Sequence, residues 1–302
     1  MIKRTLYFGN EAYLSTKDNR LVVSYPNRHD KKTIAVEDIG FLILDHFRLT
    51  ITSALLNKLL QNNTAIISCD QKHLPLGMFL NLDGHSQQLI HLEAQIGTTK
   101  AKKDRLWKQV IQAKIENQAR LLEIVGRQFD PLILWSKKVQ NGDPNNLEAR
   151  AAAYYWHRLL HDKFPDFRRS RFGDFPNSVF NYGYTILRGV VARSLVASGL
   201  LPTLGIHHHN KYTSYGLADD IMEPYRPIVD QLVIGLLEVF SDVSEFSKEI
   251  KLELLKIPVL DVVINKQKSP LMLAVQQTTS SLQKAYAGEL KDLKLPTFVR
   301  AH

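Results

Sequence analysis

A short stretch of the chain, residues 199–227, gathers side chains that could hold a metal ion. Three histidines stand together at positions 207–209, and Asp219, Asp220 and Glu223 follow just before a long apolar helical pattern. Imidazole nitrogens beside carboxylate oxygens form a mixed ligand set that suits Mg²⁺ or Mn²⁺. The same residues are also typical of a solvated turn that leads into a helix with an acidic first turn. Residue types alone leave both interpretations open.

A glutamate in an earlier helical segment is a second candidate. Asp143 followed by Pro144 predicts a helix start, with an acidic N-cap and proline at the first helical position, and the pattern continues to about Leu160. Glu148 lies near the first turns, and the small residues at 149–153 would let a neighbouring backbone approach closely. Such packing would enclose the carboxylate, but this pattern alone favours a surface glutamate in a good helix.

The helix expected from about Pro176 carries an unusual polar stripe. Asn177, Asn181, Tyr184 and Arg188 recur at helical spacing and therefore share one face. A solvent-facing stripe usually consists of Lys and Glu. Amides, a phenol and a guanidinium instead indicate hydrogen bonds, either to neighbouring helices or to a phosphate backbone.

Composition indicates a soluble protein with an anionic partner. No run approaches the ~18 apolar residues of a membrane span, and the N-terminal residues lack the apolar core of a signal peptide, so we expect a cytoplasmic protein. The single cysteine, Cys69, argues against a thiolate metal site. A formal charge of +9 favours a polyanion such as DNA. Basic residues cluster in two places, at Lys100, Lys102, Lys103, Arg105 and Lys108 and at Arg168, Arg169 and Arg171, although a solvated surface explains either cluster alone.

The order of the patterns predicts an α+β protein of two domains. Short β-branched and aromatic runs separated by turn formers fill the first 75 residues and indicate a small antiparallel sheet or sandwich. Strong helix formers dominate from about residue 87 onward. We therefore expect an N-terminal β domain at 1–85 and a larger, mostly helical, catalytic domain at 86–302.

Several of these motifs together resemble one known family. Glu148, the segment Asn-Tyr-Gly-Tyr-Thr-Ile-Leu at 181–187, the segment Leu-Gly-Ile-His-His at 204–208 and the segment Asp-Asp-Ile-Met-Glu-Pro-Tyr-Arg-Pro at 219–227 occur in this order. They resemble the CRISPR-associated integrase family, Cas1, over essentially the whole chain, and in detail the type II form found beside the Cas9 effector. This likeness agrees with the α+β domain order.

The resemblance implies a set of functional residues. It makes Glu148, His208 and Glu223 the catalytic metal ligands, with Glu223 in place of the aspartate that many members carry. Asp220 matches a second acidic position and is a possible auxiliary acid. The resemblance and the polar patterns together suggest low-specificity contacts to DNA phosphates by Lys211, Asn181, Tyr184, Arg188, Arg168, Arg169 and Arg171.

The family also implies an activity and partners. Its members insert short DNA fragments (prespacers) into a CRISPR array by attack of a 3′-hydroxyl, with Mg²⁺ or Mn²⁺, and water in place of that hydroxyl would give endonuclease activity. The expected partners are double-stranded DNA of the prespacer and of the CRISPR repeat and leader, a second copy in a homodimer formed by the β domain, and the small Cas2 protein, which bridges two dimers into a heterohexamer. Two alternatives are a metal-dependent nuclease of branched or damaged DNA without integration, and a basic DNA-binding protein without catalysis.

Overall fold

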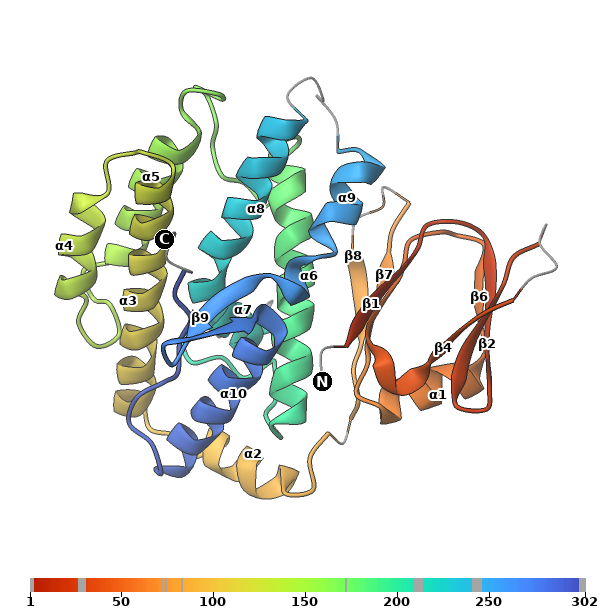
Figure 1. Cartoon of the computed structure of the whole chain (residues 1–302). Helices are drawn as coiled ribbons and strands as arrows, with labels where there is room; N and C mark the ends of the chain where they lie inside the picture. Colours follow the sequence, from red (N-terminus) through yellow and green to blue (C-terminus); the bar gives the residue numbers. More distant parts are fainter. Residues whose placement is uncertain are drawn as a thin grey trace. The chain divides into compact units, whose positions relative to one another are not determined.

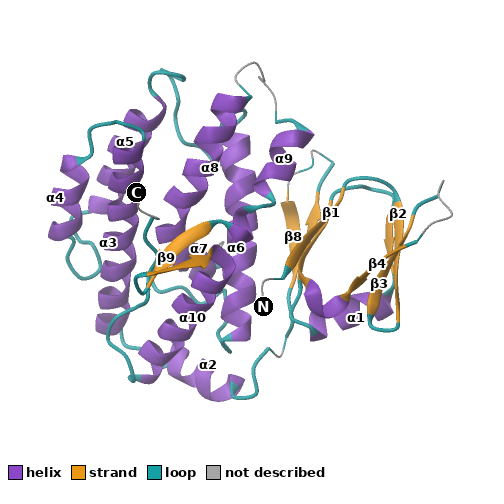
Figure 2. Ribbon diagram, in the orientation of Figure 1, coloured by secondary structure: helices purple, strands orange, loops and turns teal. Residues whose placement is uncertain are grey.

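The computed structural model describes residues 3–26, 31–71, 73, 75–82, 84–171, 173–208, 214–240 and 246–298. The chain divides into two compact units, Met1–Ser86 and Gln87–His302. The first unit is rich in strands and the second is mostly helical, as Figures 1 and 2 show. The predicted α+β fold class is confirmed.

The N-terminal unit contains two four-stranded sheets and one helix. The first sheet has the order β1 (Arg4–Phe8), β5 (Ile39–Leu44), β7 (Ala65–Cys69) and β8 (Pro75–Phe79). The second has the order β4 (Lys32–Ala35), β3 (Arg20–Ser24), β2 (Ala12–Lys17) and β6 (Leu49–Ile51). Helix α1 (Ser53–Gln61) connects β6 to β7.

The expectation of antiparallel pairing was wrong for most of the first sheet and for the pair β2–β6 of the second, which is parallel. Strands β1, β5 and β7 run parallel, and only β8 pairs antiparallel with its neighbour. Strand β5 reads Ile-Gly-Phe-Leu-Ile-Leu and is buried along almost its whole length. Such a continuous apolar run is typical of a parallel strand that is covered on both faces.

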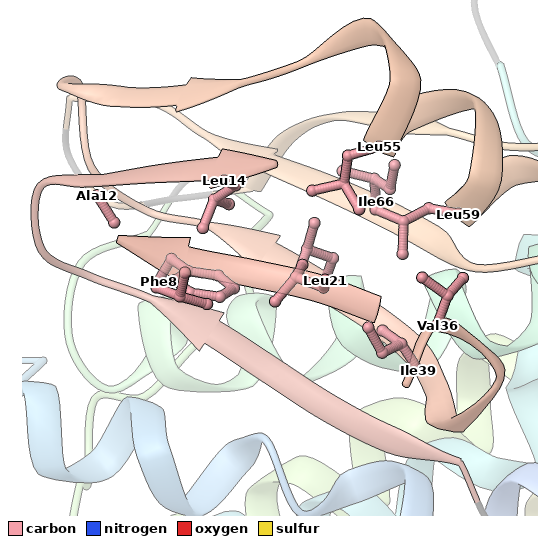
Figure 3. Close-up of a cluster of buried hydrophobic side chains, with 11 residues drawn as sticks. Phe8, Ala12, Leu14, Leu21, Val36, Ile39, Leu55, Leu59 and Ile66 are labelled. Carbon is pink, nitrogen blue, oxygen red and sulfur yellow. The ribbon is translucent and has the colours of Figure 1, made fainter. Parts of the chain in front are cut away.

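The core of this unit consists of aliphatic and aromatic side chains from both sheets and α1 (Figure 3). In β2, buried Ala12 and Leu14 alternate with the exposed Tyr13. This period of two is what a strand with one covered face requires. Complete burial of a leucine side chain contributes about 1.5–3 kcal/mol to folding.

The C-terminal unit is built around two long helices. Its helices are α2 (Gln88–Ile96), α3 (Lys100–Ile124), α4 (Asp130–Lys138), α5 (Leu147–Leu160), α6 (Asn177–Ala197), α7 (Gly216–Met222), α8 (Arg226–Val239), α9 (Lys248–Leu254) and α10 (Leu271–Ala287). Helix α3 packs against α4, α5 and α8, and α6 packs against α7, α8, α9 and α10. A hairpin of β9 (Asp261–Ile264) and β10 (Gln267–Pro270), which the sequence patterns did not indicate, lies within this unit.

Helix α5 begins later than predicted. Its first residue is Leu147 rather than Pro144, because Asp143 and Asn146 both adopt left-handed backbone conformations that interrupt a helix. The Asp143 carboxylate nevertheless caps the helix, since it accepts hydrogen bonds from the backbone N–H groups of Leu147 (3.0 Å) and Glu148 (2.9 Å). This cap fixes the first turn of α5 and with it the position of Glu148.

Membrane-spanning helices are long and continuously apolar. No helix in the described ranges combines the length and the hydrophobicity that crossing a bilayer requires.

Candidate active site

Two of the predicted ligands meet around one buried ammonium. The Lys114 Nζ atom of α3 lies 2.7 Å from Glu148 Oε1 on α5 and 2.5 Å from Glu223 Oε2, in the short 3₁₀ turn Glu223–Tyr225 between α7 and α8. The side chains of Lys114 and Glu223 are 8% and 3% exposed, and that of Glu148 is 22% exposed. The fold thus brings the two carboxylates, which are far apart in the sequence, to a single cation.

A second cation holds the other oxygen of Glu223. Arg226 Nη1 lies 3.1 Å from Glu223 Oε1, one helical turn away. Burial alone would raise the pKa of Glu223, but Arg226 and Lys114 together hold it below its usual range. Burial likewise opposes the charge of Lys114, whereas Glu223 and Glu148 raise its pKa. Lys114 and Glu223 thus favour each other's charged form.

A buried aspartate fixes the loop that carries His208. Asp220 Oδ2 accepts hydrogen bonds from the backbone N–H groups of Ile206 (2.6 Å) and His207 (2.9 Å). Its Oδ1 atom accepts one from His208 N (3.2 Å) and lies 2.6 Å from His208 Nδ1. Because Nδ1 faces Asp220, the Nε2 atom of His208 is the one left to bind a ligand. Asp220 is accordingly placed to orient the histidine.

The same contact changes the charge of the histidine. The hydrogen bond to Asp220 raises the pKa of His208, burial opposes the increase, and the negative charges of Asp220, Glu223 and Glu148 add to it. The hydrogen bond to Asp220 is the largest of these effects.

Close packing holds the loop from two sides. A Cβ atom at Gly205 would lie 2.2 Å from the His208 carbonyl oxygen, and one at Gly216 would lie 2.3 Å from the same atom. Only glycine fits at these positions. On the other side, the Trp107 ring of α3 stacks on His207, with ring centroids 4.3 Å apart and planes 1° from parallel.

Among the described residues, no three His, Cys, Asp or Glu side chains are arranged so that they could hold a metal ion together. The reason is visible in the contacts above, because Lys114 stands between the two carboxylates. The chemistry of the donor set nevertheless fits a cation, since a positive charge already occupies the space between their oxygens.

A cavity of about 490 Å³ adjoins this cluster. Lys114 and Arg226 form part of its wall, and the rest is largely basic and aromatic, with Trp156, His157, His161, Phe164, Phe167, Arg168, Arg169 and Tyr184. Asp230 also lines it, and its carboxylate accepts hydrogen bonds from the hydroxyl groups of Tyr184 (2.6 Å) and Tyr155 (2.7 Å). Aromatic faces and cations are the groups that bind single-stranded nucleic acid.

The polar stripe of α6 hydrogen-bonds within the protein. The Arg169 guanidinium donates to Asn177 Oδ1 (3.0 Å) and Asn181 Oδ1 (2.6 Å) and lies 5.1 Å from the centre of the Tyr184 ring. Arg188 Nε lies 2.6 Å from Asp219 Oδ1. The hydrogen bonds of the stripe that the structure describes are therefore made to other segments of the protein.

Three further residues were predicted to contact DNA, namely Arg168, Arg171 and Lys211. The Arg168 and Arg171 carbonyl oxygens accept hydrogen bonds from Asn177 Nδ2 (3.0 Å) and Asn181 Nδ2 (2.9 Å), so α6 fixes the backbone of this basic loop. Lys211 lies outside the described residues.

Sequence reasoning missed Lys114 and Trp107. Both lie on α3, seven residues apart, in register with the buried Val110. Lys114 could have been found because it lies on the apolar face of a long helix, where a buried lysine needs a buried counter-charge.

Fold and site together define a class: an α+β protein whose helical unit holds two carboxylates around a buried ammonium, beside a basic and aromatic cavity, and a histidine that a buried aspartate orients. Residues 6–250 match the family model described as CRISPR associated protein Cas1, and the chain belongs to this family. It is 32% identical to the CRISPR-associated endonuclease Cas1 of Neisseria meningitidis serogroup C, over 98% of this chain and 96% of the relative. A Cas1 endonuclease of Francisella tularensis subsp. novicida is 24% identical, over 92% of this chain and 93% of its own. The family expected from the motifs is confirmed.

Solved structures share the fold. A casposase bound to an integration product aligns with a TM-score of 0.80 at 18% identity, covering 97% of this chain and 92% of the casposase. A Cas1 protein from Thermotoga maritima aligns with a TM-score of 0.77 at 17% identity, covering 99% of this chain and all of the other. A chain of a Cas6-RT-Cas1–Cas2 complex gives a TM-score of 0.75 at 19% identity, covering 96% of this chain and 35% of that one.

Proposed function

We propose that this protein is a CRISPR adaptation integrase. It joins the 3′-hydroxyl of a short DNA fragment to a phosphodiester of the CRISPR array by transesterification, and with water as the nucleophile it cuts DNA. Membership of the Cas1 family, a relative named as an endonuclease and a casposase of the same fold support this activity. The observation that carries the proposal is the pair Glu148 and Glu223 around one cation position, with His208 in the same cluster.

The catalytic groups of the chain have separate tasks. Glu148, Glu223 and the Nε2 atom of His208 would hold Mg²⁺ or Mn²⁺. When bound, such an ion neutralises phosphoryl oxygens and lowers the pKa of the attacking hydroxyl group. Asp220 orients the His208 ring, and Arg226 keeps Glu223 ionised through its contact at Oε1. Exchange of one phosphodiester for another conserves the number of such bonds, so the reaction needs no nucleotide triphosphate.

DNA would reach these groups through the basic cavity. Arg168 and Arg169 line it beside Lys114 and Arg226, which makes them the first candidates for contacts to DNA phosphates. Asn181 and Tyr184 contribute by holding Arg169 in place. Lys211, Arg171 and Arg188 complete the proposed set of polar contacts on the basis of the sequence.

The proposed assembly contains other protein chains. We expect a homodimer formed by the β unit and a Cas2 protein that bridges two dimers into a heterohexamer. Large apolar side chains on the N-terminal unit support an interface there, because Phe47, Leu76, Phe79 and Leu82 are 84%, 77%, 49% and 93% exposed. Likeness to a chain of a Cas1–Cas2 complex supports the second partner.

A strand-transfer assay tests the function. A labelled duplex with or without a terminal 3′-hydroxyl is incubated with a plasmid carrying a CRISPR array, Cas2 and Mn²⁺, using wild type and Glu148→Gln, His208→Ala and Glu223→Gln. We expect joining only with wild type and only with the 3′-hydroxyl. The control Glu253→Gln removes a surface carboxylate that pairs with Lys256 and should join normally. Cutting without joining would instead identify a nuclease without an integration role, and joining by any site variant would remove that residue from the ligand set.

A further inference from the structure

The ammonium group of Lys114 occupies the position between Glu148 and Glu223. Lys114 Nζ contacts Glu148 Oε1 and Glu223 Oε2 at 2.7 and 2.5 Å, and these are the two carboxylates that the proposed function gives to the metal ion. An ammonium group carries three donors and no lone pair, so it cannot share a coordination sphere as a ligand. A metal ion would have to approach the same oxygens to about 2.0–2.2 Å. Both cations cannot occupy this position together.

We propose that Lys114 is an internal counter-cation that keeps the position between Glu148 and Glu223 filled in the metal-free protein and gives it up when a divalent ion binds. This inference rests on the proposed function, because it assumes that the carboxylate pair is the metal site. It adds a direct competition between a side chain and the metal ion for the same oxygens.

Burial explains why such a group is needed. Glu223 is 3% exposed, and two carboxylates that face each other in a site with little water repel strongly. Arg226 balances only Glu223, through the oxygen that Lys114 does not touch. Lys114 is the group that links the two acids, so it preserves their approach until a metal ion replaces it.

The side chain and its surroundings allow the exchange. A lysine has a flexible four-carbon stem and a single charged atom, unlike the rigid fork of an arginine. Lys114 also lines the cavity of about 490 Å³, so its ammonium has polar space to enter when it leaves the carboxylates. A divalent ion can displace it because two charges interact more strongly with the carboxylates than one does. A monovalent ion gains no such advantage, and the site should therefore reject Na⁺ and K⁺.

The test measures metal binding rather than catalysis. Full-length wild type and Lys114→Met, both stripped with a chelator, are titrated with Mn²⁺ while the free ion is followed by electron paramagnetic resonance. Methionine has a similar length and no charge, so removal of the competitor should tighten Mn²⁺ binding by about tenfold or more. Mn²⁺ should also raise the melting temperature of Lys114→Met more than that of wild type, because the metal-free variant lacks the cation that links the two carboxylates.

Lys251→Met is the matched control. Lys251 belongs to the same unit and is 7% exposed, as is Lys114, but its Nζ atom lies over the Phe246 ring. Its replacement should leave Mn²⁺ affinity at the wild-type value. A second measurement needs no variant: the rate at which an amine-acylating reagent labels Lys114 in wild type, normalised to Lys251, should increase when Mn²⁺ is added.

The outcomes separate this inference from the proposed function. Equal or weaker Mn²⁺ binding by Lys114→Met, or an unchanged labelling rate in a wild type that binds Mn²⁺, overturns the counter-cation while the metal site stands. Binding by the variant alone supports the competition in its strongest form. If neither protein binds Mn²⁺, the carboxylate pair is not a metal site, and both this inference and the metal-dependent part of the proposed function fail.

Discussion

Replacement of Asp220 by asparagine tests whether this buried carboxylate holds the histidine loop. One oxygen accepts hydrogen bonds from Ile206 N and His207 N, and the other accepts one from His208 N and contacts the His208 ring. Asparagine keeps one acceptor oxygen and places an NH₂ group at the other position. Two of these four groups therefore lose their acceptor whichever way the amide is oriented.

The size of the effect follows from these contacts. Each buried donor that loses its partner costs about 1–3 kcal/mol, so Asp220→Asn should lower the free energy of unfolding by about 2–6 kcal/mol. The pKa of His208 should fall toward its ordinary value, because the bond to Asp220 is the largest cause of its increase. Urea denaturation measures the first change, and an NMR titration of the histidine ring measures the second.

The neighbouring carboxylate provides the control. Asp219 pairs with Arg188, and both side chains are partly exposed, at 19% and 23%. Asp219→Asn should cost no more than about 1 kcal/mol. The reasoning fails if the free energies of unfolding of Asp220→Asn and Asp219→Asn differ by less than about 0.5 kcal/mol, or if the pKa of His208 stays raised in Asp220→Asn. In either case the Asp220 carboxylate does not organise the loop.

Three further changes probe other parts of the molecule. Gly205→Ala places a Cβ atom 2.2 Å from the His208 carbonyl oxygen, so the loop must shift; we expect a lower melting temperature and loss of strand transfer, and normal joining would contradict the packing argument. Burial raises the pKa of Asp230 to about 6, against the opposing hydrogen bonds of its two tyrosines. A carboxyl group whose pKa is raised by folding stabilises the folded state at pH values below its pKa in the unfolded chain, and this stabilisation is lost as the pH rises through the folded-state pKa. Urea titrations should therefore show that the free energy of unfolding of wild type falls by about 3 kcal/mol relative to that of Asp230→Asn as the pH rises from about 4 through 6. A difference that does not change with pH would refute this. Leu14→Ala should destabilise the β unit by about 2–5 kcal/mol, and the exposed neighbour Tyr13→Ala should cost far less in the same denaturation experiment.

Strands could be predicted from the N-terminal sequence, but their partners could not. The apolar run Ile39–Leu44 indicates a buried strand wherever it pairs. Its parallel alignment with β1 depends on the connection through β2, β3 and β4, and that with β7 on the connection through β6 and α1. Local patterns record the tendency to form a strand, whereas pairing is decided by packing between segments.

The candidate site divides in the same way. Histidine and carboxylate residues are common metal ligands, so Glu148, His208 and Glu223 could be singled out from the sequence. Their role as metal ligands stays a prediction. Lys114 gives no such signal, because its charge appears in the sequence as one more basic residue on a helix full of them. Only the packing of α3 against α5 and the turn at Glu223 shows that this charge is buried.

The polar stripe of α6 shows a third limit. Its side chains were expected to bind either protein or DNA, and sequence spacing contains no information about which. In the folded chain, Arg169 of the preceding loop donates hydrogen bonds to the side chains of Asn177 and Asn181. The choice between partners thus depends on a segment whose position no helical period can predict.

The cation position between Glu148 and Glu223 is assembled from α3, α5 and the turn before α8, and the loop of His208 lies between α6 and α7. These parts can become neighbours only after the chain has been synthesised at least as far as the turn at Glu223. A chain still emerging from the ribosome, or a proteolytic fragment that ends before Glu223, has no place for the cation.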